Sequence, residues 1–179
     1  TASQVTRSEL THADVTGAII PQKRTADGET IEDMIQDHGL WVASLGQHGR
    51  QLKARGIDAT GLEAARAKLP AADMRDTVLA DANLSHVNLT MSDLEGAHLR
   101  KARMAFADLR GAKLSGIKAN GVVMMNADLS PMPIGGLGGK KWPVRAHGAV
   151  LSGGDLRKTN MRGIDLTGGS LFKTDLRDA

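Results

Sequence analysis

Six histidines and a set of regularly spaced aspartates and asparagines are the residues of this chain that could do acid–base or metal chemistry. The histidines are His12, His38, His48, His86, His98 and His147. They form no H-x-x-x-H or H-E-x-x-H pattern, so the sequence predicts no zinc site. The chain also has no cysteine, which excludes disulfides and cysteine ligands. We therefore expect neither a metal nor a cofactor.

The aspartates and asparagines fall on a five-residue spacing, as at Asp73, Asn83, Asn88 and Asp93. Such regularity is typical of turn residues whose side chains bond nearby backbone amides. The sequence has no Ser–His–Asp arrangement and no nucleophile elbow. A glycine-rich stretch, GGLGGKK, resembles a phosphate-binding loop only loosely, because Ile134 and Lys141 replace the required Gly and Ser/Thr. The sequence therefore predicts that the protein is not an enzyme.

Two groups of residues are candidates for interaction with a partner. They are His98, Arg100, Lys101 and Arg103, and Lys140, Lys141, Trp142 and Arg145. A nucleic-acid groove needs a longer basic track with aromatic side chains for the bases. The net charge of +3 is small, and of the segments 1–49, 50–129, 130–148 and 149–179 only 130–148 combines three basic side chains with no acidic one. Weak binding to nucleic acid or to an anionic surface therefore remains an alternative function.

Trp142 has two interpretations. It lies beside Lys141 and Arg145, and tryptophan and arginine are enriched at interface hot spots. Alternatively, the indole folds back over an apolar ledge that includes Met132 and Ile134. The sequence alone does not decide between the two.

The element that must position these residues reads in blocks of five from residue 50 to residue 129. The fifth letter is apolar in all 16 blocks, and the third is mostly small or apolar. Where the fifth letter is alanine, the third letter is a larger apolar residue, as in Leu52 with Ala54 and Ile117 with Ala119. That exchange conserves volume, which indicates that both letters face one interior.

A period of five fits neither an α-helix nor a β-strand, but it fits a chain that turns a corner every five residues. Four corners would close a coil of about 20 residues, and stacked coils would pair about 4.8 Å apart. The aromatic content of 2% agrees with a narrow interior.

The blocks ADANL, MSDLE, AFADL, RGAKL and MNADL resemble the pentapeptide-repeat family, whose consensus is A(D/N)LXX. The resemblance implies an all-β fold, the right-handed quadrilateral parallel β-helix. It also implies that type II topoisomerases are possible partners, since some members bind them. Members that imitate duplex DNA need an acidic surface, which this mildly basic chain does not predict. The stretch HGLWVASLGQHGRQ is similar to the lead-in before the repeats of related bacterial proteins.

The expected organisation has five parts. Residues 1–20 form a first coil or the tail of an upstream solenoid, 21–49 a linker and capping helix, 50–129 the main solenoid of four coils, 130–141 a corner loop, and 142–179 the final coils. The helix is predicted from the apolar spacing between Ile31 and Leu45, with Thr30 and Asp33 as a capping box and Gly46 as a stop.

We expect a non-enzymatic, rigid solenoid that acts as a protein-interaction or structural module. The first alternative is a topoisomerase-binding protein of the quinolone-resistance type that acts through the corner loop. The partner is expected to be another protein, and the uncapped coil that ends at Leu176 could also self-associate. No apolar run is long enough to span a bilayer and no secretory leader is visible, which favours the cytoplasm.

Overall fold

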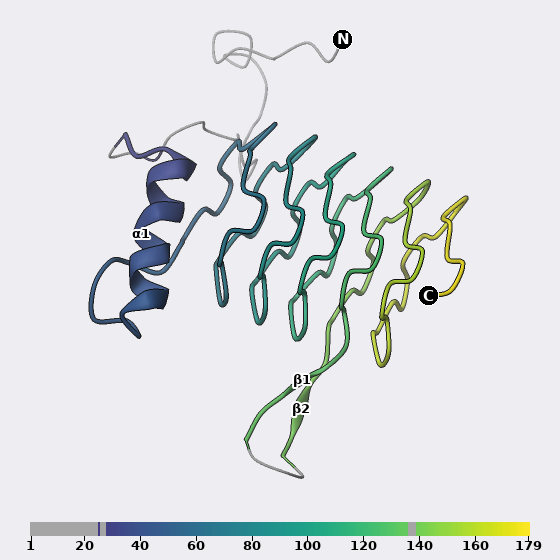
Figure 1. Ribbon diagram of the computed structural model, residues 1–179. Helices are drawn as coiled ribbons and strands as arrows, with labels where there is room; N and C mark the ends of the chain where they lie inside the picture. Colours follow the sequence, from purple (N-terminus) through teal and green to yellow (C-terminus); the bar gives the residue numbers. More distant parts are fainter. Residues whose placement is uncertain (1–24, 26–27, 136–138) are drawn as a thin grey trace, which may run out of the picture.

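The chain folds as a stack of coils with a helix packed against one end (Figure 1). The computed structural model describes residue 25 and residues 28–135 and 139–179; the coil expected over residues 1–20 lies outside them. Within the described part are the helix α1 (Ile31–Ala43) and the strands β1 (Met132–Pro133) and β2 (Lys141–Trp142). The two strands form a small antiparallel hairpin that leaves the stack.

Neighbouring coils meet through parallel bridges of one residue each rather than through long strands. Away from the hairpin, each bridge joins residues 20 apart, for example Lys53 with Asp73 and Asp58 with Val78. Because bridges recur every five residues, one coil has four sides of five residues. The predicted period and coil length are therefore confirmed.

The hairpin interrupts the sequence but not the stack. Bridges across it join residues 32 apart, such as Lys113 with Arg145 and Asp128 with Asn160, so the insertion adds 12 residues to one coil. The sequence predicted a loop over residues 130–141. The structure instead pairs Met132 with Trp142, one residue beyond that range, and so adds two short strands that the sequence did not predict.

Each corner is a four-residue turn that starts at the fifth letter of a block. At the first corner, the Ile57 N–H donates to the Ala54 carbonyl oxygen, with an N···O distance of 3.1 Å. Gly56, the third residue of this turn, has φ +67°. A positive φ at that position is the mark of a type II turn. Non-glycine residues take the same conformation at other corners, including Phe106 at φ +60°.

Where the fourth letter of a block is Asp or Asn, its side chain accepts a hydrogen bond from the backbone N–H two residues later, at the next corner. The Thr90 N–H donates to Asn88 Oδ1 over 3.0 Å, and the Ser130 N–H donates to Asp128 Oδ1 over 2.9 Å. The backbone bonds between coils do not use these amides. The prediction that the regular Asp and Asn residues bond nearby amides is therefore confirmed.

The core is the column of side chains inside the stack. Leu52 and Ala54 are 1% and 0% exposed, so both inward letters of the exchanged pair are buried. A few third letters carry hydroxyls, and these are buried with a partner. Thr77 Oγ1 donates to the Ala54 carbonyl oxygen and Ser92 Oγ to the Leu69 carbonyl oxygen, each over 2.7 Å. These bonds to the preceding coil compensate for the loss of water.

The helix α1 packs against the first coil and covers that end of the core. Its inner face buries Ile31, Met34 and His38. The capping box is confirmed, because Thr30 Oγ1 accepts from the Asp33 N–H and the Asp33 carboxylate accepts from the Thr30 N–H. The helix ends at Ala43, two residues before the predicted Leu45, because Leu45 and the residue after it both have positive φ.

The register of the blocks can be tested with a matched pair on one side of the stack. Leu89 is fully buried, whereas His86 is an exposed corner residue with φ +58°. We expect Leu89→Asp to lose several kcal/mol of unfolding free energy, because a carboxylate would be buried without a partner. His86→Asp should lose less than about 1 kcal/mol, because Asp tolerates that conformation. Equal thermal melting temperatures for the two variants would show that the register is wrong.

Candidate interaction site

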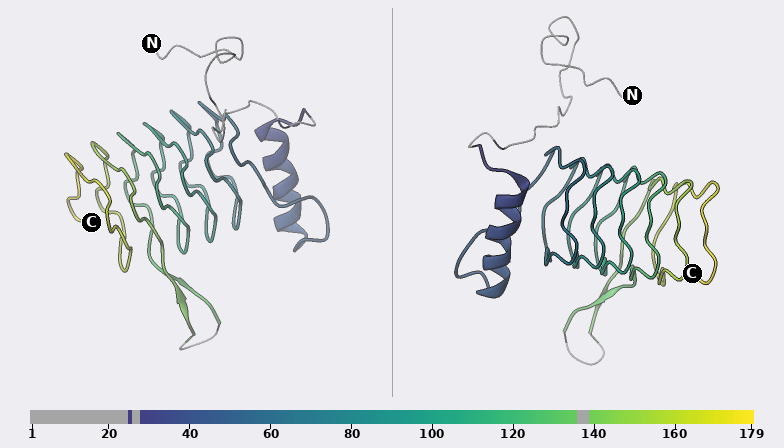
Figure 2. Two further views of the ribbon diagram at one scale, coloured as in Figure 1. Left: turned by 180° about the vertical axis from the view of Figure 1, so that it is seen from behind. Right: turned by 45° about the horizontal axis from the view of Figure 1, so that its top comes forward.

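The hairpin is the part of the described structure that leaves the stack, and it does so at the corner between Leu129 and Trp142 (Figure 2). Met132 lies opposite Trp142, and Pro133 lies opposite Lys141. The Ile134 N–H donates to the Lys140 carbonyl oxygen over 2.8 Å and extends the pairing. The outer part of the turn, residues 136–138, lies outside the described residues.

The base of the hairpin sits directly on Gly111. A Cβ atom at Gly111 would lie 2.7 Å from Met91 Sδ and 2.9 Å from Met132 Cβ, with Trp142 Cδ1 at 3.5 Å. Gly111 also has φ +69°. This corner therefore needs a residue with no side chain, both for its conformation and for the approach of the hairpin.

Trp142 combines the two interpretations that the sequence left open. One side of the indole approaches Gly111 opposite Met132, yet the residue keeps 38% of its surface exposed. The Arg145 guanidinium lies 5.8 Å from the Trp142 ring centroid, within the range of a cation–π contact. Trp142 thus anchors the hairpin and also presents a surface to solvent.

Several exposed side chains of the hairpin and its base form what we call the hairpin patch. Its residues are Ile134, Lys140, Lys141, Trp142 and Arg145. None of the ion pairs among the described residues involves the three cations of this patch. The patch therefore combines exposed apolar side chains with three positive charges that have no ion pair in the described structure.

The second candidate group, residues 98–103, is largely neutralised by neighbouring coils. Arg100 Nη2 lies 3.7 Å from Asp81 Oδ2, and Arg103 Nη2 lies 3.3 Å from Glu63 Oε1. Burial lowers the pKa of His98, and the nearby Lys118 lowers it further. His98 is therefore neutral at pH 7, and Lys101 is the member of this group that carries a charge without an ion pair in the described structure.

The structure does not bring the two groups together. Arg145 bridges to Lys113 on the first side of the stack, whereas Arg103 bridges to Asn83 on the third. The hairpin leaves at the corner between the fourth and first sides, and Arg100 and Lys101 lie at the corner between the second and third. The groups therefore occupy diagonally opposite corners and cannot form one surface.

Sequence reasoning missed a repeated Asp-x-Arg clamp. Four arginines bind the aspartate two residues before them: Arg75, Arg110, Arg157 and Arg177. In one of them, Arg110 Nε lies 2.9 Å from Asp108 Oδ1 and Arg110 Nη2 lies 2.6 Å from Asp108 Oδ2. The Arg177 clamp lowers the pKa of Asp175 to about 2. A sequence signal for these clamps exists: the fourth letter of a block is aspartate and the first letter of the next block is arginine.

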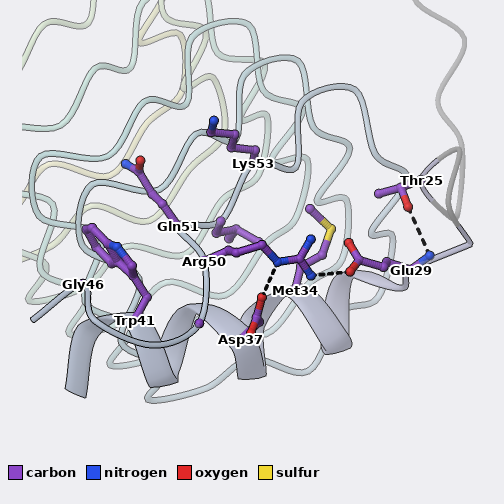
Figure 3. A pocket seen from close by; sticks show the side chains of 11 residues that line it. Thr25, Glu29, Met34, Asp37, Trp41, Gly46, Arg50, Gln51 and Lys53 are labelled. Carbon is purple, nitrogen blue, oxygen red and sulfur yellow. Dashed lines mark hydrogen bonds and ion pairs between the residues drawn. The ribbon is translucent and has the colours of Figure 1, made fainter. Parts of the chain in front are cut away.

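A pocket of about 530 Å³ lies between α1 and the first coil (Figure 3). Arg50 crosses it and binds both Glu29 and Asp37, with 2.6 Å between Arg50 Nε and Asp37 Oδ2. These carboxylates raise the pKa of Arg50 above its usual value. The sequence did not predict this site. The paired charges of Arg50, Glu29 and Asp37 thus link α1 to the start of the first coil, and Lys53 also lines the pocket.

The described structure has neither a cluster of metal ligands nor a membrane-spanning helix. It contains no group of three or more His, Asp or Glu side chains that could hold a metal ion. Among the same residues, no helix is both long and apolar enough to cross a membrane.

The model of the pentapeptide-repeat family, "Pentapeptide repeats", matches eight copies in residues 61–93, 77–116 and 147–179. The chain belongs to the pentapeptide-repeat family. Proteins of this family fold as right-handed β-helices, in agreement with the parallel bridges between coils. No curated protein matches the chain significantly.

Three solved structures illustrate the similarity. A pentapeptide repeat protein from the Arabidopsis thaliana thylakoid lumen is 20% identical over 70% of this chain and 66% of its own, with a TM-score of 0.41. HetL, involved in heterocyst differentiation regulation in Nostoc sp. strain PCC 7120, is 21% identical over 75% and 91%, with a TM-score of 0.26. A plasmid-mediated fluoroquinolone resistance protein is 19% identical over 64% and 79%, also with a TM-score of 0.26. This chain thus spans slightly under two thirds of the Arabidopsis protein.

The seat of the hairpin can be tested with two corner glycines. Gly111 and Gly116 have φ +69° and +68°, but a Cβ at Gly116 would meet only the Gly96 nitrogen at 4.0 Å. Both Ala variants should lose about 1 kcal/mol for the left-handed conformation. Only Gly111→Ala should also displace the hairpin and shift the fluorescence of Trp142.

The fluorescence is measured in a Trp41→Phe background, which leaves Trp142 as the sole tryptophan. Gly116→Ala is the control for the conformational cost. If Trp142 emission were the same in both variants, the hairpin would not depend on Gly111.

Proposed function

We propose that this pentapeptide-repeat protein is a non-enzymatic, rigid protein-interaction module that contacts its partner through the hairpin patch. Parallel bridges that continue on both sides of the hairpin support the idea of a rigid stack. The stack would then hold the patch at a constant position. The proposal includes the quadrilateral form of the β-helix expected from the sequence.

The observation that carries the proposal is the composition of the patch. Trp142 is anchored on one side, exposed on the other and adjacent to the Arg145 guanidinium. Ile134 is 41% exposed beside it, and Lys140 and Lys141 add positive charge. A partly preordered aromatic residue loses little entropy on binding, and Trp and Arg dominate many interface hot spots.

Charge complementarity identifies the kind of partner. A protein surface that fits this patch carries an apolar pocket for the indole, with acidic side chains around it. A type II topoisomerase is the class of partner that the family resemblance suggests. The nucleic-acid alternative is less well supported, because Asp81 and Glu63 neutralise the arginines of the 98–103 group.

We test this function with a charge reversal, Lys140→Glu with Lys141→Glu, and with Trp142→Ala. The matched control is Lys101→Glu with Lys118→Glu, two exposed lysines on other parts of the stack. Proteins captured from the source organism by the wild type and the control, but not by the hairpin variants, are the candidate partners. For a purified partner we expect Trp142→Ala to weaken binding at least tenfold, because truncating a hot spot costs about 2 kcal/mol.

Circular dichroism establishes that each variant retains its coils. The dissociation constant of the purified pair is then measured at two salt concentrations, because screening should weaken a contact between opposite charges. Equal affinity for the wild type and both hairpin variants would overturn the proposal.

A further inference from the structure

His38 joins α1 to the first coil through a hydrogen bond that only a neutral imidazole can make. The Leu52 N–H donates to His38 Nδ1 over 2.9 Å, and His38 is 0% exposed. Because Nδ1 accepts, we assign the ring proton of the neutral form to Nε2. This bond satisfies a backbone amide at the point where the chain enters the first coil.

The other ring nitrogen is buried without a hydrogen bond among the described residues. The His38 ring stacks on the Trp41 ring, with 5.3 Å between their centroids. Burial lowers the pKa of His38, and the Pro70 carbonyl offsets only part of that effect. The site therefore favours the uncharged ring.

No nearby carboxylate is positioned to stabilise a charged His38. The charged or titratable side chains on α1 and on the adjoining stretches of the first coils include Glu32, Asp33, Asp37, His48, Arg50, Lys53, Lys68 and Asp73. Asp37 and Glu29 bind Arg50, and Asp73 binds Arg75. Within the described structure, no ion pair includes His38, and no charged group shifts its pKa.

Protonation would place an N–H on Nδ1 directly opposite the Leu52 N–H. The acceptor of the hydrogen bond would be lost, and a positive charge would be buried without a counterion, which is strongly unfavourable. The simplest relief is for the ring to move into solvent. Because His38 lies on the inner face of α1 with Ile31 and Met34, that movement separates the inner face from the coil.

We propose that α1 is an acid-sensitive cap, in which protonation of His38 separates the inner face of the helix from the first coil and uncovers the apolar end of the solenoid. The Arg50 clamp to Glu29 and Asp37 does not involve His38. Arg50 therefore keeps the helix attached while its inner face opens, and the change is reversible. This inference does not depend on the hairpin patch.

The direction of the pH dependence follows from the preference for neutral His38. The closed state binds the proton less readily than the open state, so the stabilisation is fully present above pH 6.5 and declines as the pH falls below that value. One proton taken up by the open state raises the opening equilibrium constant up to about tenfold per pH unit.

The experiment measures amide hydrogen exchange of the full chain at pH 7.5 and at pH 5.5, corrected for the intrinsic effect of pH. We expect protection of α1 and of the Leu52 amide to fall by up to about tenfold between the two values. Peptides from residues 89–129 should keep their protection and serve as the internal control. Unchanged protection of α1 would overturn the proposal.

Two variants assign the effect to His38. In His38→Gln, the side-chain amide oxygen can accept from Leu52 but does not titrate, so the ratio of protection between the two pH values should be one. His48→Gln removes an exposed histidine of the same region and should keep the wild-type ratio. A wild-type ratio in His38→Gln would overturn the proposal.

A wild-type measurement covers the case in which His38→Gln fails to fold. An NMR titration of the His38 ring should give a midpoint below 6.5 that coincides with the onset of α1 exchange. A His38 midpoint at or above 6.5 contradicts the mechanism.

Discussion

Every corner of the stack except the one that carries the hairpin has one residue with a positive φ, and the rest of the architecture depends on this backbone conformation. The N–H that closes the turn and the bridge to the next coil are both placed by it, as at Ile57 and Asp58. Glycine adopts the conformation without strain, whereas other residues lose about 1 kcal/mol. Even Phe106 adopts this conformation, because the backbone hydrogen bonds on both sides of the corner fix the path of the chain.

Much of the fold could be predicted from the sequence because the constraint repeats. A period of five with two inward letters locates the buried residues, and the exchange between Leu52 and Ala54 indicates a shared interior. The capping box of α1 is a local pattern and could also be read directly. The hairpin register could not, because it is decided by the contact of Met132 and Trp142 with Gly111. No local periodicity carries that information.

The site was predicted only in part for a similar reason. Lys140, Lys141 and Arg145 were identified from their composition, but the neutralisation of Arg103 was missed. Its partner Glu63 lies two coils away, and a long guanidinium side chain can reach over one intervening coil at about 4.8 Å per step. Writing the sequence in rows of 20 residues and comparing alternate rows would have exposed the pair. The contact of His38 with Leu52 has no comparable sequence signal, because it depends on where a separate helix docks.

The ladder that continues across the hairpin has a consequence for how such a protein can change. Coils on either side of the insertion pair as if it were absent, as Lys113 and Arg145 show. An extra segment at a corner therefore only has to begin and end at adjacent points, and its length is nearly unconstrained by the stack. The chain thus separates a regular frame from an appendage whose length and sequence the frame does not restrict. New recognition elements could be inserted at such a corner, by evolution or by design, without a change in the packing of the core.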